Sequence, residues 1–148
     1  MQNSFILKRF INASPKVVWQ ALTDSALVKK YLFGSAIESN WEIGGSIIFY
    51  VENDGVRTDA VYGKIEQLET NSLFRHTLYP SNADYPNIPE NHLYVEYTLK
   101  ENNGNTELTI EQGGFLYAPD GEKRFESAIS GWKQALPELA KVAEQANK

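Results

Sequence analysis

The sequence contains no cysteine, which excludes disulfides, thiol nucleophiles and thiolate metal sites. This absence fits a reducing compartment, and we expect a cytoplasmic protein. The N-terminus does not have the basic and then apolar pattern of a signal peptide, because apolar and polar residues alternate there and Lys8-Arg9 interrupts them. No run approaches the roughly 20 apolar residues that span a bilayer. We therefore expect a soluble protein with no membrane span.

Positive charge is also scarce. Lys and Arg number 14 against 19 Asp and Glu, which gives a net charge of −5. The longest basic runs are the pairs Lys8-Arg9, Lys29-Lys30 and Lys123-Arg124. Because binding to a phosphate backbone needs a clustered basic surface, we expect no nucleic-acid partner. An anionic membrane surface is disfavoured for the same reason.

No catalytic or cofactor motif is apparent. No serine lies in a nucleophile elbow between glycines, and the only histidines, His76 and His92, have no metal-ligand spacing. Gly44-Gly45 and Gly113-Gly114 do not lead directly into a helix, so they do not form a phosphate-binding loop. The sequence therefore predicts no metal and no cofactor, and it favours binding over catalysis.

Apolar and aromatic residues are plentiful by contrast. Hydrophobic residues make up 42% and aromatic residues 12% of the 148 residues, with 3 Trp, 8 Tyr and 7 Phe. A chain of this length is typical of one domain, and we expect a single domain over residues 1–148. A packed core does not need so many rings, so some of them are expected to line a cavity.

Strand patterns dominate the first three quarters of the chain. Residues Ser4–Ile11 read as a first strand, and Ser14 followed by Pro15 predicts the start of a short helix. Thr23-Asp24 then offers a second cap, for another short helix that ends near Lys30. Period-2 alternation and hairpin turns then predict five further strands, at about residues 46–52, 58–68, 73–79, 92–99 and 107–111. The long segment Pro80–Asn91 has no periodicity, and we expect it to be either disordered or a functional lid.

From about Glu122 the apolar period becomes helical. One apolar stripe is formed by Phe125, Ile129, Trp132, Leu136, Leu139 and Ala143. A single long helix can cover a sheet of this size only if the sheet curls around it. The sequence therefore predicts an α+β fold, in which a curved antiparallel sheet of about six strands wraps around a C-terminal helix. The imperfect fit between helix and sheet leaves a cavity.

Five segments resemble motifs of a known family. Residues 12–24, NASPKVVWQALTD, are similar to its helix entry ASPEKVWQALTDP. Residues 31–34, YLFG, and 41–49, WEIGGSIIF, resemble its FG…W.VGG.I.F segment. Residues 111–115, EQGGF, and 131–136, GWKQAL, resemble its closing GF…GW…L pattern. The chain is thereby identified as a member of the activator of heat-shock protein 90 ATPase homologue-like family, within the START-like (SRPBCC, Bet v 1-like) superfamily.

The resemblance implies a helix-grip fold with a deep hydrophobic pocket. Pockets of this superfamily hold lipids, sterols, flavonoid-like or polyketide-like molecules, and some members are enzymes that act on them. The candidate ligand-binding residues are Tyr31, Phe33, Trp41, Phe49, His76, Tyr97, Phe115, Phe125, Ile129, Trp132 and Leu136. For three of these residues, Trp41, Trp132 and Leu136, the sequence favours core packing over ligand contact.

The alternation of side chains along the strands predicts which of the two histidines points into the interior. If the strands on either side of Pro80–Asn91 pair as a hairpin, the face of Leu93, Val95 and Tyr97 points inward and brings His76 into the interior. His92 then points outward. A buried imidazole needs a hydrogen-bond partner, and most such histidines are structural rather than catalytic.

Three functions remain open. The first is a non-enzymatic binder of an apolar or aromatic small molecule, in which His76 or Tyr97 orients the ligand. The second is a cyclase, dehydratase or hydrolase acting on such a substrate. The third is a protein-interaction module of the chaperone-regulator type, a role that belongs to larger family members with an additional domain. The sequence does not determine the oligomeric state, and a monomer is the expectation.

Overall fold

A computed structural model describes residues 2–146. The elements in chain order are β1 (Ser4–Ile11), α1 (Pro15–Thr23), α2 (Ser25–Val28), β2 (Ala36–Ser39), β3 (Ser46–Asn53), β4 (Val56–Glu69), β5 (Leu73–Pro80), the 3-10 turn η1 (Pro89–Asn91), β6 (Leu93–Asn102), β7 (Asn105–Gly113) and α3 (Gly121–Ala146).

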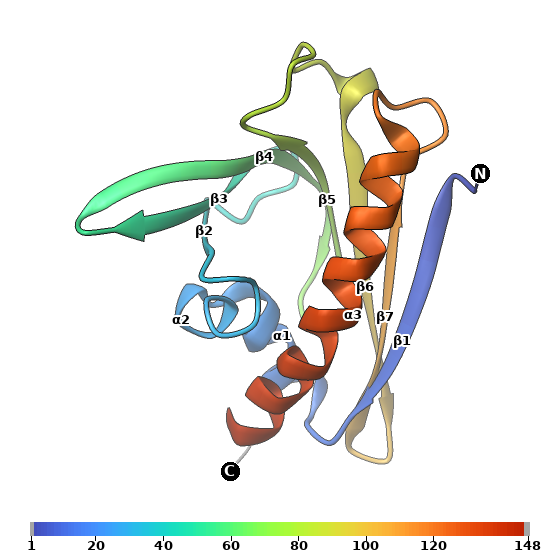
Figure 1. Cartoon of the computed structure of the whole chain (residues 1–148). Helices are drawn as coiled ribbons and strands as arrows, with labels where there is room; N and C mark the ends of the chain where they lie inside the picture. Colours follow the sequence, from blue (N-terminus) through green and yellow to red (C-terminus); the bar gives the residue numbers. More distant parts are fainter. Residues whose placement is uncertain (1, 147–148) are drawn as a thin grey trace.

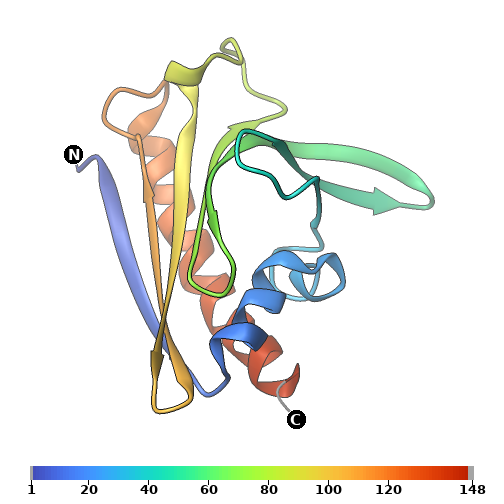
Figure 2. The ribbon, with the colours of Figure 1, turned by 180° about the vertical axis from the view of Figure 1, so that it is seen from behind.

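The strands form one antiparallel sheet in the order β1-β7-β6-β5-β4-β3-β2. The sheet curves, and α3 runs along its concave side (Figures 1 and 2). The α+β helix-grip architecture predicted from the sequence is thus confirmed. The described chain holds seven strands rather than about six, because β2 is only four residues long and alternation over so few residues gives no clear signal.

Side-chain caps begin the two short helices where the sequence predicts them. The Ser14 hydroxyl accepts a hydrogen bond from the Val17 amide at 3.4 Å, and Pro15 occupies the first helical position. Asp24 caps α2 by accepting from the Ala26 amide at 2.9 Å. Both helices lie at one end of the concave face (Figure 1).

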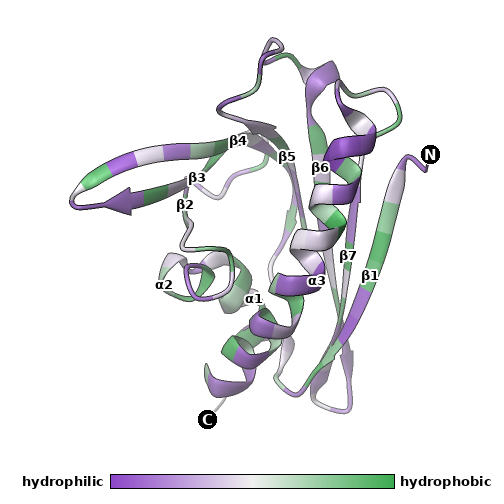
Figure 3. Cartoon of the chain, in the orientation of Figure 1, coloured by the Kyte–Doolittle hydropathy of each residue, from purple (hydrophilic) through white to green (hydrophobic). Residues whose placement is uncertain are grey.

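The core lies between α3 and the inward face of the sheet. Figure 3 shows hydrophobic and hydrophilic residues alternating along the strands. The hairpin of β5 and β6 pairs His76 with Val95 and buries both, so the predicted inward parity is confirmed. In β1 large apolar residues occur on both faces of the strand. The structure buries Phe5 and Ile11 there and exposes Ile6 and Phe10.

No helix within residues 2–146 is both long enough and apolar enough to cross a membrane.

Two irregularities bend the sheet. The register shifts between β3 and β4 at Phe49/Tyr50, and between β4 and β5 at Ile65/Gln67. Near the second shift, Gly63 lies so close to β5 that a Cβ atom would come within 1.9 Å of the Thr77 carbonyl oxygen. The neighbouring Lys64 amide donates to the Thr77 hydroxyl at 3.0 Å. The close approach of β4 to β5 at this point therefore requires a glycine at position 63.

We predict that Gly63→Ala lowers the free energy of unfolding by about 3 kcal/mol, because the methyl group meets rigid backbone. Urea unfolding measures this change. Gly131→Ala is the matched control, since a Cβ at that position meets nothing within 4 Å. Equal stability of Gly63→Ala and the wild type would contradict the close approach.

Candidate ligand-binding cavity

A cavity of about 270 Å³ lies between α3 and the concave face of the sheet. Its wall comes from the segment after α2, from five strands and from α3. The lining residues are Leu32, Phe33, Ser35, Phe49, Val61, His76, Leu78, Val95, Tyr97, Gln112, Ala128, Gly131, Trp132 and Ala135. Most of these side chains are apolar, so the cavity is suited to an apolar molecule.

Three residues in register form what we call the cavity floor: His76, Val95 and Gln112. His76 pairs with Val95, and Val95 pairs with Gln112, so the three lie side by side on β5, β6 and β7. Neighbouring strands are about 4.8 Å apart, which separates the Cα atoms of His76 and Gln112 by about 10 Å. The small Val95 side chain between them leaves a space bounded by one polar group on each side.

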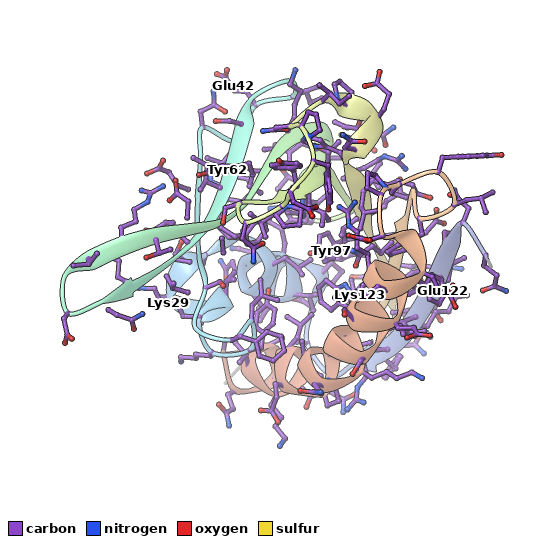
Figure 4. All side chains as sticks on the ribbon, turned by 45° about the horizontal axis from the view of Figure 1, so that its top comes forward. Lys29, Glu42, Tyr62, Tyr97, Glu122 and Lys123 are labelled. Atoms are coloured by element: carbon purple, nitrogen blue, oxygen red, sulfur yellow. The ribbon has the colours of Figure 1, made fainter. Side chains whose placement is uncertain are left out.

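Trp132 closes the cavity from the helix side. Its indole Nε1–H donates to Gln112 Oε1 at 2.9 Å, which ties α3 to β7. Its ring meets the Tyr97 ring edge-on, with 5.9 Å between centroids. Figure 4 shows Tyr97 in the interior between the sheet and α3, whereas Lys29 and Glu42 lie at the periphery. Because an indole N–H only donates, this bond turns the Gln112 oxygen toward Trp132 and leaves its amide nitrogen as a donor.

Gly131 lies in the cavity wall, near the middle of α3. A glycine inside a helix costs about 1 kcal/mol relative to alanine. A Cβ here would meet nothing within 4 Å, so no packing contact requires glycine. The absence of a side chain at this position keeps the cavity open.

Phe33 stands at the mouth of the cavity and is 66% exposed. Its backbone has φ of 53°, in the left-handed region, and Gly34 follows with φ of 81°. A bulky residue rarely adopts this conformation. The turn after α2 therefore holds a large aromatic side chain in water beside an apolar opening.

His76 is 2% exposed and contributes its imidazole to the wall. Its Nδ1 lies 2.8 Å from the Thr77 carbonyl oxygen, and because a carbonyl only accepts, Nδ1 carries the proton. Burial lowers the pKa of His76 to about 4, although the Thr77 bond and Glu66 oppose the shift. The ring is therefore neutral at pH 7. Burial also raises the pKa of the Tyr97 hydroxyl.

The eleven candidate residues from the sequence fall into two groups. Five line the cavity: Phe33, Phe49, His76, Tyr97 and Trp132. Six lie elsewhere in the structure: Tyr31, Trp41, Phe115, Phe125, Ile129 and Leu136.

The second group packs the core or anchors the short helices. Phe5, Phe115 and Phe125 form a cluster with centroids 5.1 to 5.9 Å apart. The Tyr31 hydroxyl donates to the Ala21 carbonyl at 2.8 Å, and burial raises its pKa. Trp41 packs on Phe74, with 5.6 Å between centroids. The phenylalanines and Tyr31 are thus held by packing or by a hydrogen bond away from the cavity, and Trp41 also borders a separate hollow beside Trp19.

Ile129 and Leu136 lie on α3 and pack into the apolar core beside the cavity. Helical spacing shows that a residue faces the sheet, but it does not separate the residues over the open space from those one turn away.

The sequence reasoning omitted nine lining residues: Leu32, Ser35, Val61, Leu78, Val95, Gln112, Ala128, Gly131 and Ala135. Two of them carried a usable signal. Gln112 continues the inward phase of Leu108 and Ile110, and Gly131 interrupts a helical pattern without any turn to explain it. On α3, the small residues Ala128, Gly131 and Ala135 indicate the position of the cavity better than most of the large apolar residues do.

The segment Pro80–Asn91, expected to be disordered or a lid, is tied to the body at several points. The Tyr79 hydroxyl donates to the Tyr85 carbonyl, and the Arg124 guanidinium lies 5.2 Å from the centre of the Tyr85 ring. The Ser81 amide donates to the Ala60 carbonyl at 2.9 Å. None of the residues of the described cavity wall comes from this segment.

The low pKa of His76 predicts a specific loss of stability in acid. The unfolded chain takes up the proton near pH 6.5 and the folded chain near pH 4, so the unfolded state binds more protons between these values. We expect the wild type to lose about 2 kcal/mol more than His76→Phe between pH 7 and pH 5. Urea unfolding at each pH tests this, and parallel losses in the two proteins would contradict a buried neutral His76.

Solved structures share this fold. A protein from Cytophaga hutchinsonii superposes with a TM-score of 0.76 and 26% identity, over 98% of this chain and 96% of that one. An Hsp90 activator from Plasmodium falciparum superposes with a TM-score of 0.72 and 16% identity, over 95% and 96%. DynU16, from the dynemicin biosynthetic locus, gives a TM-score of 0.74 and 17% identity, over 99% of this chain and 49% of that one.

A comparison with curated proteins gives no significant match. A family model does match the sequence, over residues 12–144, which include α1, the cavity floor and nearly all of α3. The chain therefore belongs to the family described as Activator of Hsp90 ATPase homolog 1-like protein.

Proposed function

We propose that this protein binds a compact apolar or aromatic small molecule in the cavity between α3 and the sheet. The observation that carries the proposal is Gly131, a glycine in the middle of a helix whose missing side chain opens onto an apolar space. The protein forgoes about 1 kcal/mol of helix stability there. If the open space had no use, this loss of helix stability would bring no benefit. A ligand-binding site explains it.

The size of the cavity limits the ligand. Pockets for drug-sized molecules span about 300 to 1,000 Å³, and this cavity lies just below that range at about 270 Å³. A molecule of one to three fused rings or a short chain matches this space. Affinity would come mainly from burial of apolar surface against Phe49, Val95 and Trp132.

The chemistry of the wall favours binding over catalysis. The imidazole in the wall, His76, has a pKa of about 4, far below the value near 7 that suits a general base at neutral pH. Its neutral form can orient a ligand by a hydrogen bond. The likenesses to DynU16 and to the Plasmodium falciparum Hsp90 activator concern the fold, and neither distinguishes between the candidate functions.

Filling the cavity from Gly131 should abolish binding. We expect Gly131→Leu to place its side chain in the open space and to reduce the affinity for naphthalene at least about tenfold, since the ligand loses most of its buried area. NMR titration of 15N-labelled protein, followed at the indole signal of Trp132, measures the affinity. In the wild type this signal should shift on adding naphthalene.

The matched control is Ser130→Leu, which adds the same side chain at the preceding position of α3, where the residue is exposed. It should leave the affinity for naphthalene unchanged. Wild-type protein that shows no shift at Trp132 with naphthalene, 2-naphthol or lauric acid would sink the proposal.

The exposed ring at the mouth should contribute to affinity without contributing to stability. We expect Phe33→Asn to weaken naphthalene binding about threefold to tenfold, because the aromatic contact is lost. Asparagine tolerates a positive φ, so the free energy of unfolding should change by less than about 1 kcal/mol. The control is Tyr117→Asn, which removes a ring that is 89% exposed and lies outside the cavity wall. Equal effects of the two variants on affinity would show that Phe33 does not touch the ligand.

A further inference from the structure

The cavity wall contains a buried nitrogen with no partner. His76 Nε2 is buried and makes no hydrogen bond to any residue in the part of the chain that the structure describes. A buried polar atom left unpaired costs about 1 to 3 kcal/mol. The other imidazole differs, since the Nδ1 of His92 lies 3.0 Å from the Thr77 hydroxyl and its Nε2 contacts the Asn87 side-chain oxygen.

The neighbouring bonds fix the chemical character of this nitrogen. Because Nδ1 donates to the Thr77 carbonyl, the proton of the neutral ring is on Nδ1. Nε2 then carries a lone pair and acts only as an acceptor. Burial lowers the pKa of the ring to about 4, so this state holds throughout the neutral range.

The surroundings determine what kind of group can reach Nε2. The imidazole is flanked by the Phe49 ring at 5.4 Å and by the Tyr97 ring at 6.1 Å between centroids. Phe49, like Phe74 at 5.2 Å, offers no hydrogen-bonding group. Since His76 is only 2% exposed, a donor reaches Nε2 from the cavity when one of the flanking rings shifts. A flat aromatic ligand can replace the contacts that the displaced ring gives up.

We infer that the ligand is an aromatic molecule with a hydroxyl group, which lies over Val95 and donates a hydrogen bond to His76 Nε2. This inference rests on the proposed binding function and narrows it to one ligand class. A hydroxyl supplies the single donor that the nitrogen lacks, and the ring matches the aromatic wall. The hydrogen bond also removes the cost of leaving the buried nitrogen unpaired. The hydroxyl therefore contributes more binding free energy here than it would at a nitrogen that already has a partner.

On the other side of Val95, the Gln112 amide nitrogen remains a donor, because its oxygen accepts from Trp132. The site is therefore asymmetric, with an acceptor at His76 and a donor at Gln112. A ligand with a hydroxyl on one ring would bind in one orientation.

The test compares 2-naphthol with its methyl ether, 2-methoxynaphthalene, which keeps the rings and lacks the donor. We expect the wild type to bind 2-naphthol about tenfold more tightly. In His76→Phe, which keeps an aromatic ring and removes the acceptor, the preference should fall below about twofold. Equal affinities of the two compounds for the wild type would overturn the inference.

A measurement on the unaltered protein covers the case in which His76→Phe fails to fold. In a histidine-selective 15N spectrum of the wild type, saturating 2-naphthol should move the Nε2 resonance of His76, and 2-methoxynaphthalene should not. The Nε2 resonance of His92 serves as the internal control, because its partner is already in place. A stationary His76 signal with bound 2-naphthol would equally overturn the inference.

Gly131→Leu separates this inference from the proposed function. If both compounds bind the wild type equally and neither binds Gly131→Leu, the cavity binds ligands and only the hydroxyl preference is wrong. If neither compound binds the wild type, both the proposed function and the inference are wrong.

Discussion

One helix has to cover the concave face of a seven-stranded sheet, and the rest of the structure depends on this constraint. A helix with its side chains is about 10 to 12 Å wide, whereas a sheet of seven strands is about 30 Å across. The sheet therefore curls around α3, helped by register shifts in β4 and by the close approach at Gly63. The short helices α1 and α2 close the remaining end (Figure 1). The space that α3 does not fill is the cavity.

A buried hydrogen bond helps to set the height of the helix above the sheet, together with the apolar residues of α3 that pack in the core. Trp132 donates to Gln112 at 2.9 Å in a buried setting, and a buried donor left unpaired would be costly. The bond holds α3 at the distance set by two long side chains. Gly131, next to Trp132, contributes no side chain to the gap thus formed. The Trp132 indole keeps α3 away from the sheet, and the missing side chain at Gly131 leaves the resulting space unfilled.

Polar groups are few in this cavity, and their states follow from their neighbours. Burial alone would make a charged imidazole unstable, and the Thr77 carbonyl decides which nitrogen of the neutral His76 ring keeps the proton. The same low dielectric raises the pKa of Tyr97 and keeps its hydroxyl protonated. The wall is thus neutral at physiological pH. It can recognise a ligand by shape and by single hydrogen bonds, whereas ion pairs would play no part.

The sequence by itself determined the order of the elements except for the short strand β2, the caps at Ser14 and Asp24, the inward phase of β5 and β6 and the amphipathic face of α3. These are local features, and each depends on periods of 2 or 3.6 residues or on turn chemistry. Only the tertiary structure decided which inward residues border the open space and which fill the core. Phe125 and Trp132 share one helical stripe, but Phe125 packs against Phe5 and Phe115 while Trp132 lines the cavity. That difference arises from the curvature of the sheet and the height of the helix, which are set by contacts between residues far apart in the chain.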